Sequence, residues 1–277
     1  MVCGSLARRI GTILCCLLVS YAARGVPPTH KDTALVLNEE AALARSQAAI
    51  GVTLADFRFV DQTGREVRLK DFRGKPLVIS LIYTSCYHTC PTMTMQLAKA
   101  AEIAREALGE ASFSVLTVGF DTEVDNPDRM RMFAKERGIR VPGWTFASAD
   151  AETIRGFTEE LGFTYVRSPR GFDHLTQTTI VDAEGGIYHQ VYGETIDAPR
   201  FVEPLKQLVW GTEAKSSTLS GWITGVRLFC TVYDPTTGRY TFDYSIFVAA
   251  IIGALCLGSV VVFLVRSWRQ SKPSRRA

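Results

Sequence analysis

Residues 77–91 read LVISLIYTSCYHTCP, a nearly continuous apolar run that leads directly into two cysteines four positions apart. The run, residues 77–83, is rich in β-branched and aromatic side chains, which predicts a central strand buried on both faces. Ligands in α/β sheets bind at the carboxyl ends of strands, so Cys86 and Cys90 fall where a binding site is expected. One short segment therefore predicts both the centre of the fold and the candidate site.

A helix is predicted directly after the cysteines. Pro91 lies where a first-turn proline is favoured, and Gly109 lies where a glycine ends a helix. Because proline disfavours helical backbone at the residue before it, Cys90 is expected to cap the helix rather than to lie inside it. Apolar residues recur every three or four positions and predict the buried face: Met93, Leu97, Ala101, Ala104 and Leu108.

The flanking segments complete an α/β pattern. Residues 57–60 and 66–69 alternate between apolar and polar side chains around the turn-forming sequence DQTG, which predicts a hairpin. Further strands are predicted at residues 113–120, 145–146, 177–182 and 186–192, and helices at residues 127–137, 151–161 and 198–210. Strands that alternate with helices between two hairpins predict an α/β domain with a mixed central sheet.

The cysteine pair is suited to a soft metal or to reversible disulfide chemistry. Two cysteines four apart can place both sulfurs on one side of a turn, and a helix N-terminus stabilises a thiolate. Thiolates favour Cu(I) or zinc, while imidazole also suits Cu(II). Zinc is the less favoured metal, because only two of its usual four ligands are present locally. A structural disulfide in an exported domain is the alternative interpretation, and the two residues alone leave it open.

A third metal ligand has to come from elsewhere, and the chain has four histidines. His30 falls in the expected linker, and His88, between the cysteines, is expected to point to solvent. His189 lies in the middle of a predicted strand, where a structural role is expected. His174 follows a predicted turn, on a loop next to a sheet edge, from which it can reach a neighbouring strand end. An ordinary surface histidine is the alternative.

The net charge of +3 is unevenly distributed. Eight of the 31 basic residues lie within residues 1–24 and 266–277, which hold no acidic residue, so the rest of the chain has 23 basic against 28 acidic residues. A nucleic-acid-binding domain concentrates basic residues in its folded part, so no nucleic-acid partner is expected. The basic residues instead flank the two most apolar segments, a pattern typical of membrane proteins.

The C-terminal apolar segment, residues 246–265, contains no charge, and a helix of this length spans a hydrocarbon core of about 30 Å. A buried core helix is the alternative, but the segment has no polar face. The positive-inside rule places the basic tail, residues 266–277, in the cytoplasm and the preceding chain outside. Residues 1–23 are typical of a signal peptide, with Arg8 and Arg9 before a short apolar run; an uncleaved anchor is the alternative.

Several of these motifs together resemble the Sco/SenC family, thioredoxin-like copper proteins that help to assemble cytochrome oxidase. The resemblance covers roughly residues 52–213 and is carried by residues 83–91, 120–127, 173–174, 180–187 and 191–193. It implies a thioredoxin-like fold and copper bound by Cys86, Cys90 and His174. It also implies delivery of that copper to the CuA site of oxidase subunit II, or reduction of the cysteines of that site.

The best-known members carry their anchor at the N-terminus, whereas this chain carries it at the C-terminus. In this respect it resembles a bacterial subgroup with a Cys-x-x-Tyr-Asp-Pro segment, here residues 230–235, before a C-terminal span. The resemblance implies a protein of the bacterial inner (cytoplasmic) membrane, with the domain facing the periplasm or outside and the C-terminus in the cytoplasm.

Together these features predict a membrane-anchored copper metallochaperone for a respiratory cytochrome c oxidase. One alternative is a thiol–disulfide oxidoreductase that reduces the client's cysteines, and another is a copper or redox sensor. Of these three functions, only the oxidoreductase would make the chain an enzyme. His174 discriminates among them, because a pure dithiol exchanger needs no third ligand. The expected parts are a signal peptide (1–23), a linker with one short helix (24–51), the copper-binding domain (52–213), a juxtamembrane segment (214–245), a transmembrane helix (246–265) and a basic tail (266–277).

Cys230 is left as an odd exported thiol once Cys86 and Cys90 are paired. Residues 234–238 are typical of a turn, which predicts a small hairpin around them. The thiol is expected to be buried as an apolar group beside the membrane. The alternative is a copper relay or a partner for an intermolecular disulfide.

Overall fold

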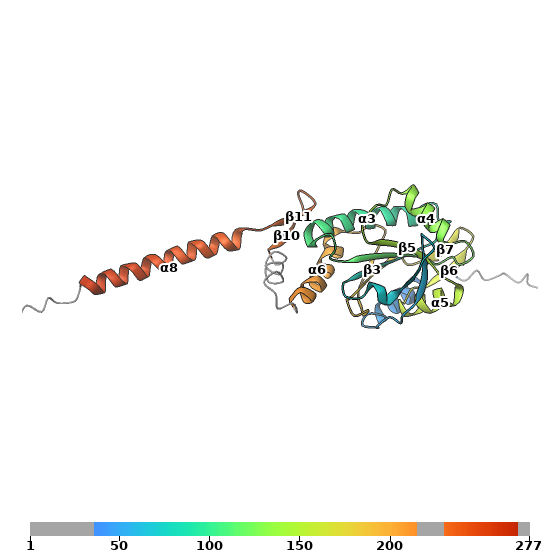
Figure 1. Ribbon diagram of the computed structural model, residues 1–277, viewed down its shortest axis with the longest axis horizontal. Helices are drawn as coiled ribbons and strands as arrows, with labels where there is room; N and C mark the ends of the chain where they lie inside the picture. The colour runs from blue at the N-terminus through green and yellow to red at the C-terminus, as the bar shows by residue number, and fades with distance from the viewer. Residues whose placement is uncertain (1–35, 215–229, 271–277) are drawn as a thin grey trace, which may run out of the picture. The chain divides into compact units, whose positions relative to one another are not determined.

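The computed structural model describes residues 36–214 and 230–270 (Figure 1). Several predicted parts lie outside the described residues: the signal peptide, His30, residues 215–229 of the juxtamembrane segment and residues 271–277 of the basic tail.

A seven-stranded sheet with strand order β2-β1-β5-β4-β3-β8-β9 lies at the centre of the domain. β3 (Leu77–Ile82) runs parallel to β4 (Ser114–Gly119) and antiparallel to β8 (Gln177–Val181). β4 also runs parallel to β5 (Trp144–Ser148). Every residue of β3 and β4 is buried, as expected for strands covered on both faces. The predicted central strand and the predicted mixed sheet are confirmed.

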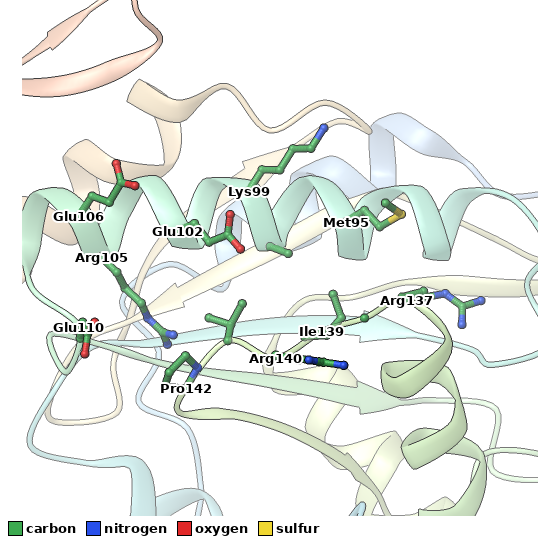
Figure 2. A pocket seen from close by; sticks show the side chains of 13 residues that line it. Met95, Lys99, Glu102, Arg105, Glu106, Glu110, Arg137, Ile139, Arg140 and Pro142 are labelled. Atoms are coloured by element: carbon green, nitrogen blue, oxygen red, sulfur yellow. The ribbon is translucent and has the colours of Figure 1, made fainter.

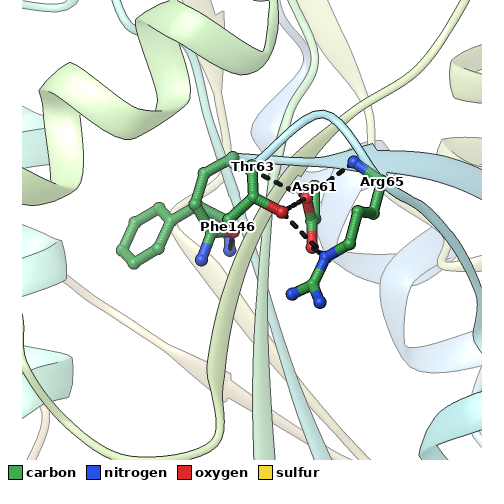
Figure 3. A network of polar contacts seen from close by, with 5 residues as sticks. Asp61, Thr63, Arg65 and Phe146 are labelled. Atoms are coloured by element: carbon green, nitrogen blue, oxygen red, sulfur yellow. Dashed lines mark hydrogen bonds and ion pairs between the residues drawn. The ribbon is translucent and has the colours of Figure 1, made fainter.

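The predicted hairpin of β1 and β2 forms one edge of the sheet. β1 (Arg58–Asp61) pairs antiparallel with β2 (Glu66–Arg68) on one side and with β5 on the other. The buried Asp61 carboxylate organises the turn between them, since its Oδ1 accepts hydrogen bonds from the Thr63 N–H, the Thr63 hydroxyl and the Arg65 N–H (Figure 3). A short 3₁₀ helix, η1 (Leu69–Phe72), follows β2 and returns the chain to β3.

Helix α3 (Thr89–Leu108) buries the face that the sequence predicts, and it ends at Gly109. Its beginning differs from the prediction: His88 is the N-cap, and Cys90 lies inside the first turn. The physical reason is local, because the Cys90 N–H donates a hydrogen bond to Cys86 Sγ and Pro91 occupies a position whose N–H needs no helical partner. The prediction that Cys90 caps the helix is therefore wrong.

The other predicted helices are present as α4 (Pro127–Glu136), α5 (Ala151–Glu160) and α6 (Ala198–Ala214). α3 and α4 lie on one side of the sheet and α5 lies on the other (Figure 1). α6 packs against α3 and against the last strand, β9 (Ile187–Tyr192). This arrangement leaves the loop between β3 and α3 at the carboxyl end of the central strand.

The short helix expected in the linker is α2 (Glu39–Ala48), capped by the Asn38 side chain. It packs on the domain, since Ser46 is fully buried and its hydroxyl lies 2.9 Å from the Tyr192 hydroxyl. The chain that follows also pairs with the sheet region, where the Gly51 N–H donates to the Ile187 carbonyl. The packed part of the chain thus includes residues before 52, and the domain boundary at that position stays a prediction.

A second hairpin, β6 (Tyr165–Ser168) and β7 (Gly171–His174), stands where the sequence predicts a loop. His174 is therefore the last residue of a strand, and it pairs directly with Tyr165. The hairpin is held by aromatic packing rather than by a hydrophobic alternation of its own. Phe172 lies 5.3 Å from Phe120 between ring centroids, in an edge-on arrangement.

After the gap in the described residues, β10 (Thr231–Asp234) and β11 (Arg239–Phe242) form the predicted hairpin, and Cys230 at its start is buried. Helix α8 (Ser245–Gln270) contains the predicted membrane segment. Within Ser245–Arg269, an 18-residue stretch has a mean hydropathy of 2.8 and is not buried against the protein, so by length and composition this helix is able to cross a membrane.

Candidate metal centre

The two cysteines lie together at the junction of β3 and α3. The Cys90 N–H donates to Cys86 Sγ over 3.3 Å, and both thiols are buried and reduced. The geometry follows from the sequence, because the two cysteines are four positions apart and the first turn of a helix brings its free N–H groups toward the preceding loop. The predicted pairing of Cys86 with Cys90 at the strand end is present.

The two thiols are electrostatically unequal. A hydrogen bond from the Cys90 thiol, aided by backbone N–H groups of Cys90 and His88, lowers the pKa of Cys86 to about 4, although burial opposes the shift. The same hydrogen bond and burial raise the pKa of Cys90 far above its usual range. The pair therefore holds one negative charge, on Cys86, and one proton, on Cys90. The positive end of α3 acts on Cys86, the residue outside the helix.

Tyr83, the last residue of the apolar run, supports this charge. Its hydroxyl hydrogen-bonds to Cys86, and burial raises the pKa of Tyr83 to about 12, so the hydroxyl stays protonated and donates. The ring packs edge-on against Phe172 at 5.2 Å. Gly171 has φ +119°, and a Cβ there would lie 2.9 Å from the Tyr83 hydroxyl oxygen. Only glycine fits at this position without displacing the tyrosine.

His174 lies in the same aromatic cluster, with its ring 6.2 Å from Tyr83 and 5.3 Å from Phe163 between centroids. Its Nδ1 is 3.1 Å from the carbonyl oxygen of Leu175. A carbonyl only accepts, so this hydrogen bond requires the proton on Nδ1 and leaves the lone pair on Nε2. Burial lowers the pKa of His174, although the charge of Cys86 opposes the shift. The ring is a neutral imidazole with Nε2 free to bind a metal.

The structure brings Cys86 and Cys90 into contact, and it connects His174 to them through Tyr83. It does not arrange the three as a finished site: across residues 36–214 and 230–270, no three side chains among histidine, cysteine, aspartate and glutamate converge as metal ligands. His88 is exposed, as expected. His189 lies in β9 and is exposed as well. The ligand set of Cys86, Cys90 and His174 stays a prediction.

Asp125 is a buried residue beside the cysteine loop whose contacts the sequence reasoning missed. Its buried carboxylate accepts hydrogen bonds from the Thr84 N–H at 2.8 Å, the Thr84 hydroxyl at 2.6 Å and the Asp121 N–H at 3.0 Å. It thereby ties the cysteine loop to the end of β4. Burial raises the pKa of Asp125, against the effect of these hydrogen bonds. The sequence signal for this role is a carboxylate just after β4, the second buried strand. From the sequence alone, that carboxylate was interpreted only as part of the start of a helix.

Comparison with known proteins agrees with this geometry. A family model described as SCO1/SenC matches residues 45–209. The SCO1 protein homolog of Bacillus subtilis (strain 168) is 24% identical over 142 residues, which cover 50% of this chain and 72% of that protein. More than half of this chain therefore has recognised relatives, and the match begins inside α2.

Two solved structures share the fold. Arabidopsis thaliana ScoI, determined with copper bound, has a TM-score of 0.50 at 19% identity, covering 60% of this chain and 100% of that chain. BsSco has a TM-score of 0.51 at 19% identity, covering 57% of this chain and 94% of that chain. It is described as a member of the Sco family of cytochrome c oxidase assembly proteins, and a disulfide switch was identified in it. Both likenesses support the thioredoxin-like fold that the sequence predicts. With its family model matched over 165 residues, this chain belongs to the SCO1/SenC family.

Proposed function

We propose that this chain is a membrane-anchored copper metallochaperone that supplies a copper site of a respiratory cytochrome c oxidase. The observation that carries the proposal is the buried Cys86–Cys90 pair, poised as thiolate and thiol beside the neutral imidazole of His174. Membership of the SCO1/SenC family supports it. The copper-bound relative and the description of BsSco as an oxidase assembly protein add support from similar folds.

Copper is the cargo in this proposal. Cys86 offers a thiolate at neutral pH, and Cys90 releases its proton when the metal arrives, so loading releases about one proton per copper. Two thiolates satisfy Cu(I), and the Nε2 atom of His174 is the third donor that Cu(II) requires. Transfer is then an exchange of ligands with a client that offers similar thiolate and imidazole donors.

An exposed rim lies next to the thiols and is where we place the client. Tyr87 is 99% exposed, and its neighbour His88 is also exposed. A fully exposed aromatic side chain between two buried ligands offers contact area to a partner at the point of exchange.

The ligand set is tested with full-length protein reconstituted with Cu(I) or Cu(II) and followed by metal content and absorption spectrum. Cys86→Ser or Cys90→Ser should abolish tight copper binding, because each removes a soft ligand. His174→Ala should weaken Cu(II) far more than Cu(I), and His88→Ala is the matched control that should change little. Loss of Cu(II) binding in His88→Ala with retention in His174→Ala would show that the third ligand is wrong.

The proposed location is the bacterial inner membrane, with the copper domain outside and the C-terminus in the cytoplasm. The support is α8, which is able to span a membrane, and the five basic residues after position 265. A reporter active only outside the cytoplasm should be active when fused after Glu213 and silent when fused after Ala277. The reverse pattern would put the cysteines in a reducing cytosol and end the oxidase proposal.

A thiol–disulfide oxidoreductase is the second candidate, and the unequal thiols favour it specifically. The Cys86 thiolate would attack a client disulfide to form a mixed disulfide, and Cys90, after losing its proton, would displace the client thiolate. The products are a Cys86–Cys90 disulfide and a reduced client. Strains that lack the protein separate the candidates: rescue of oxidase activity by added copper supports delivery, whereas rescue by a small thiol reductant alone supports reduction. Normal oxidase activity in these strains would favour a sensor.

A further inference from the structure

A pocket of about 510 Å³ lies between α3 and the loop that follows α4 (Figure 2). Its guanidinium end lies apart from the cysteine site, because Arg105 is 15 residues along α3 from Cys90, or about 22 Å at the rise of an α-helix. Met95, at the other end of the pocket, is five residues from Cys90. The lining includes the C-terminal half of α3 and residues 137–142. Nothing in the proposed function uses it.

Arg105 is the unusual residue of this pocket. Its side chain reaches from α3 toward Pro142 and Glu110 (Figure 2), and the residue is only 7% exposed. Its guanidinium carbon lies 5.0 Å from the centroid of the Phe113 ring. Among the described residues, however, Nε, Nη1 and Nη2 have no hydrogen-bond partner. A buried guanidinium without acceptors is costly. Its three nitrogen atoms are almost fully enclosed, so a small rotation of the side chain is needed to present its five N–H donors to a group that enters the pocket.

The charges around Arg105 limit the charge of that group. Lys99, Arg137 and Arg140 also line the pocket, as do three acidic residues, Glu102, Glu106 and Glu110. With Arg105 the lining carries one net positive charge. A single negative charge neutralises the pocket, whereas a dianion leaves it negative. A planar carboxylate also matches the paired N–H donors of a guanidinium.

Apart from Gly138, the rest of the lining is apolar and consists of Met95, Ala98, Ile139, Val141 and Pro142. Pockets of several hundred cubic ångströms that combine an apolar wall with a few placed polar groups hold small organic molecules. We propose that this pocket binds a small monocarboxylate with an apolar body, its carboxylate on the guanidinium of Arg105 and its body against Met95, Ile139 and Val141.

The test uses the full-length protein in a non-ionic detergent and fluorine NMR of two matched probes. 4-Fluorobenzoate carries the charge, and 4-fluorobenzamide has nearly the same shape without it. The benzoate should bind with a dissociation constant on the order of 1 mM, and at least about tenfold more tightly than the benzamide. Inorganic phosphate should compete at least about threefold more weakly than unlabelled benzoate, because it brings an excess charge.

Arg105→Met should weaken benzoate binding at least about tenfold, and Arg140→Gln about threefold. Arg129→Gln, which changes an exposed arginine outside the pocket, is the matched control and should leave binding unchanged. Arg105→Met should also keep or raise the unfolding temperature, because a buried charge without hydrogen-bond acceptors is removed. If that variant does not fold, the comparison of the two probes and Arg140→Gln still decide the question.

Equal binding of benzoate and benzamide would overturn the proposal, as would unchanged benzoate binding in Arg105→Met or tighter binding of phosphate. So would the absence of binding at about 10 mM probe. None of these outcomes bears on copper, since the cysteine variants described above retain the pocket.

Discussion

The backbone N–H of Cys90 donates to Sγ of Cys86 over 3.3 Å, so the first turn of α3 stabilises a charge on a residue that lies outside the helix. This relationship makes the two cysteines chemically different even though their sequence context is similar. Cys86 is the charged, attacking or first-binding sulfur, and Cys90 is the protonated partner that acts second.

The first prediction concerns the order in which the thiols react. With a low pKa, Cys86 is a thiolate at pH 6, whereas Cys90, with its raised pKa, is not. A short iodoacetamide pulse at pH 6, read by peptide mass spectrometry, should therefore modify Cys86 well before Cys90. Cys90→Ala should shift the titration of Cys86 upward toward the ordinary value of about 8.5, because a hydrogen-bond donor is lost. Preferential modification of Cys90 would contradict this assignment.

The second prediction concerns Asp125, which ties the cysteine loop to β4. Asp125→Ala should destabilise the protein by about 2–4 kcal/mol, because it leaves the buried N–H groups of Thr84 and Asp121 without an acceptor. It should also loosen the loop and weaken copper binding. Asp128→Ala is the matched control, since that carboxylate is exposed and pairs with Arg131 at the surface. Thermal unfolding and copper titration measure both effects, and equal behaviour of the two variants would refute the positioning role.

Local patterns were sufficient to predict the central elements. The run at residues 77–83 and the helical periodicity after it depend only on neighbouring residues, and β3 and α3 are found where these patterns predict them. The predicted mixed sheet with a thioredoxin-like fold is also confirmed. The N-cap of α3 was missed because a single hydrogen bond to a side chain outside the helix holds Cys90 in the first turn.

Those local patterns could not predict contacts between segments that are distant in the sequence. Asp125 acts on Thr84, 41 residues earlier, and no periodicity signals such a pair. The β6–β7 hairpin is stabilised by rings from other elements, so its own sequence resembles a loop. The half-buried position of His174 among aromatic rings follows from that hairpin, while its role as a copper ligand still rests on the family resemblance and stays a prediction.

The third prediction concerns Gly119, the last residue of β4. A Cβ at this position would lie 2.6 Å from Asp125 Cβ, closer than side chains approach each other. Gly119→Ala should therefore destabilise the protein by about 1–3 kcal/mol or more and displace the Asp125 carboxylate from Thr84. Gly211→Ala in α6 is the control, because nothing lies within 4 Å of its Cβ position and alanine favours a helix by up to about 1 kcal/mol. A fall in thermal stability in the control alone would contradict the prediction.

The fourth prediction is a pH dependence at Asp61. Burial acts to raise the pKa of Asp61, but hydrogen bonds from Thr63 and Arg65 outweigh it, and the pKa is lower than in the unfolded chain. A lowered folded-state pKa means that the ionised carboxylate stabilises the fold above pH 3.8, and that this contribution is lost as the pH falls through the folded-state pKa.

Asp61→Asn should therefore cost about 1–3 kcal/mol at pH 7, and the difference from the wild type should shrink below about pH 4. Glu66→Gln, at an exposed position on the neighbouring strand, is the matched control and should leave the stability at pH 7 unchanged. Unfolding curves recorded between pH 3 and pH 7 measure the difference in unfolding free energy between the wild type and Asp61→Asn. A difference in unfolding free energy that stays constant over this pH range would rule out a role for the charge of Asp61.

The last prediction concerns Cys230, the thiol left over when Cys86 and Cys90 pair. It is only 5% exposed, and its carbonyl accepts from the Asp243 N–H at 2.7 Å. The hairpin after it is fastened to α6, where the Tyr240 hydroxyl donates to Glu203 Oε1 over 3.0 Å. Burial of this kind favours the apolar interpretation of Cys230 over the copper relay.

An impermeant maleimide applied to intact membranes should therefore leave Cys230 unlabelled, while the urea-unfolded protein should label fully. Tyr240→Phe should increase labelling about tenfold, because the loss of a hydrogen bond to a charged acceptor makes local opening of the hairpin easier. Tyr244→Phe, at an exposed position nearby, is the matched control and should have no effect. Rapid labelling of wild-type Cys230, together with loss of oxidase assembly in Cys230→Ala, would instead support the relay, whereas no labelling and normal assembly would exclude it.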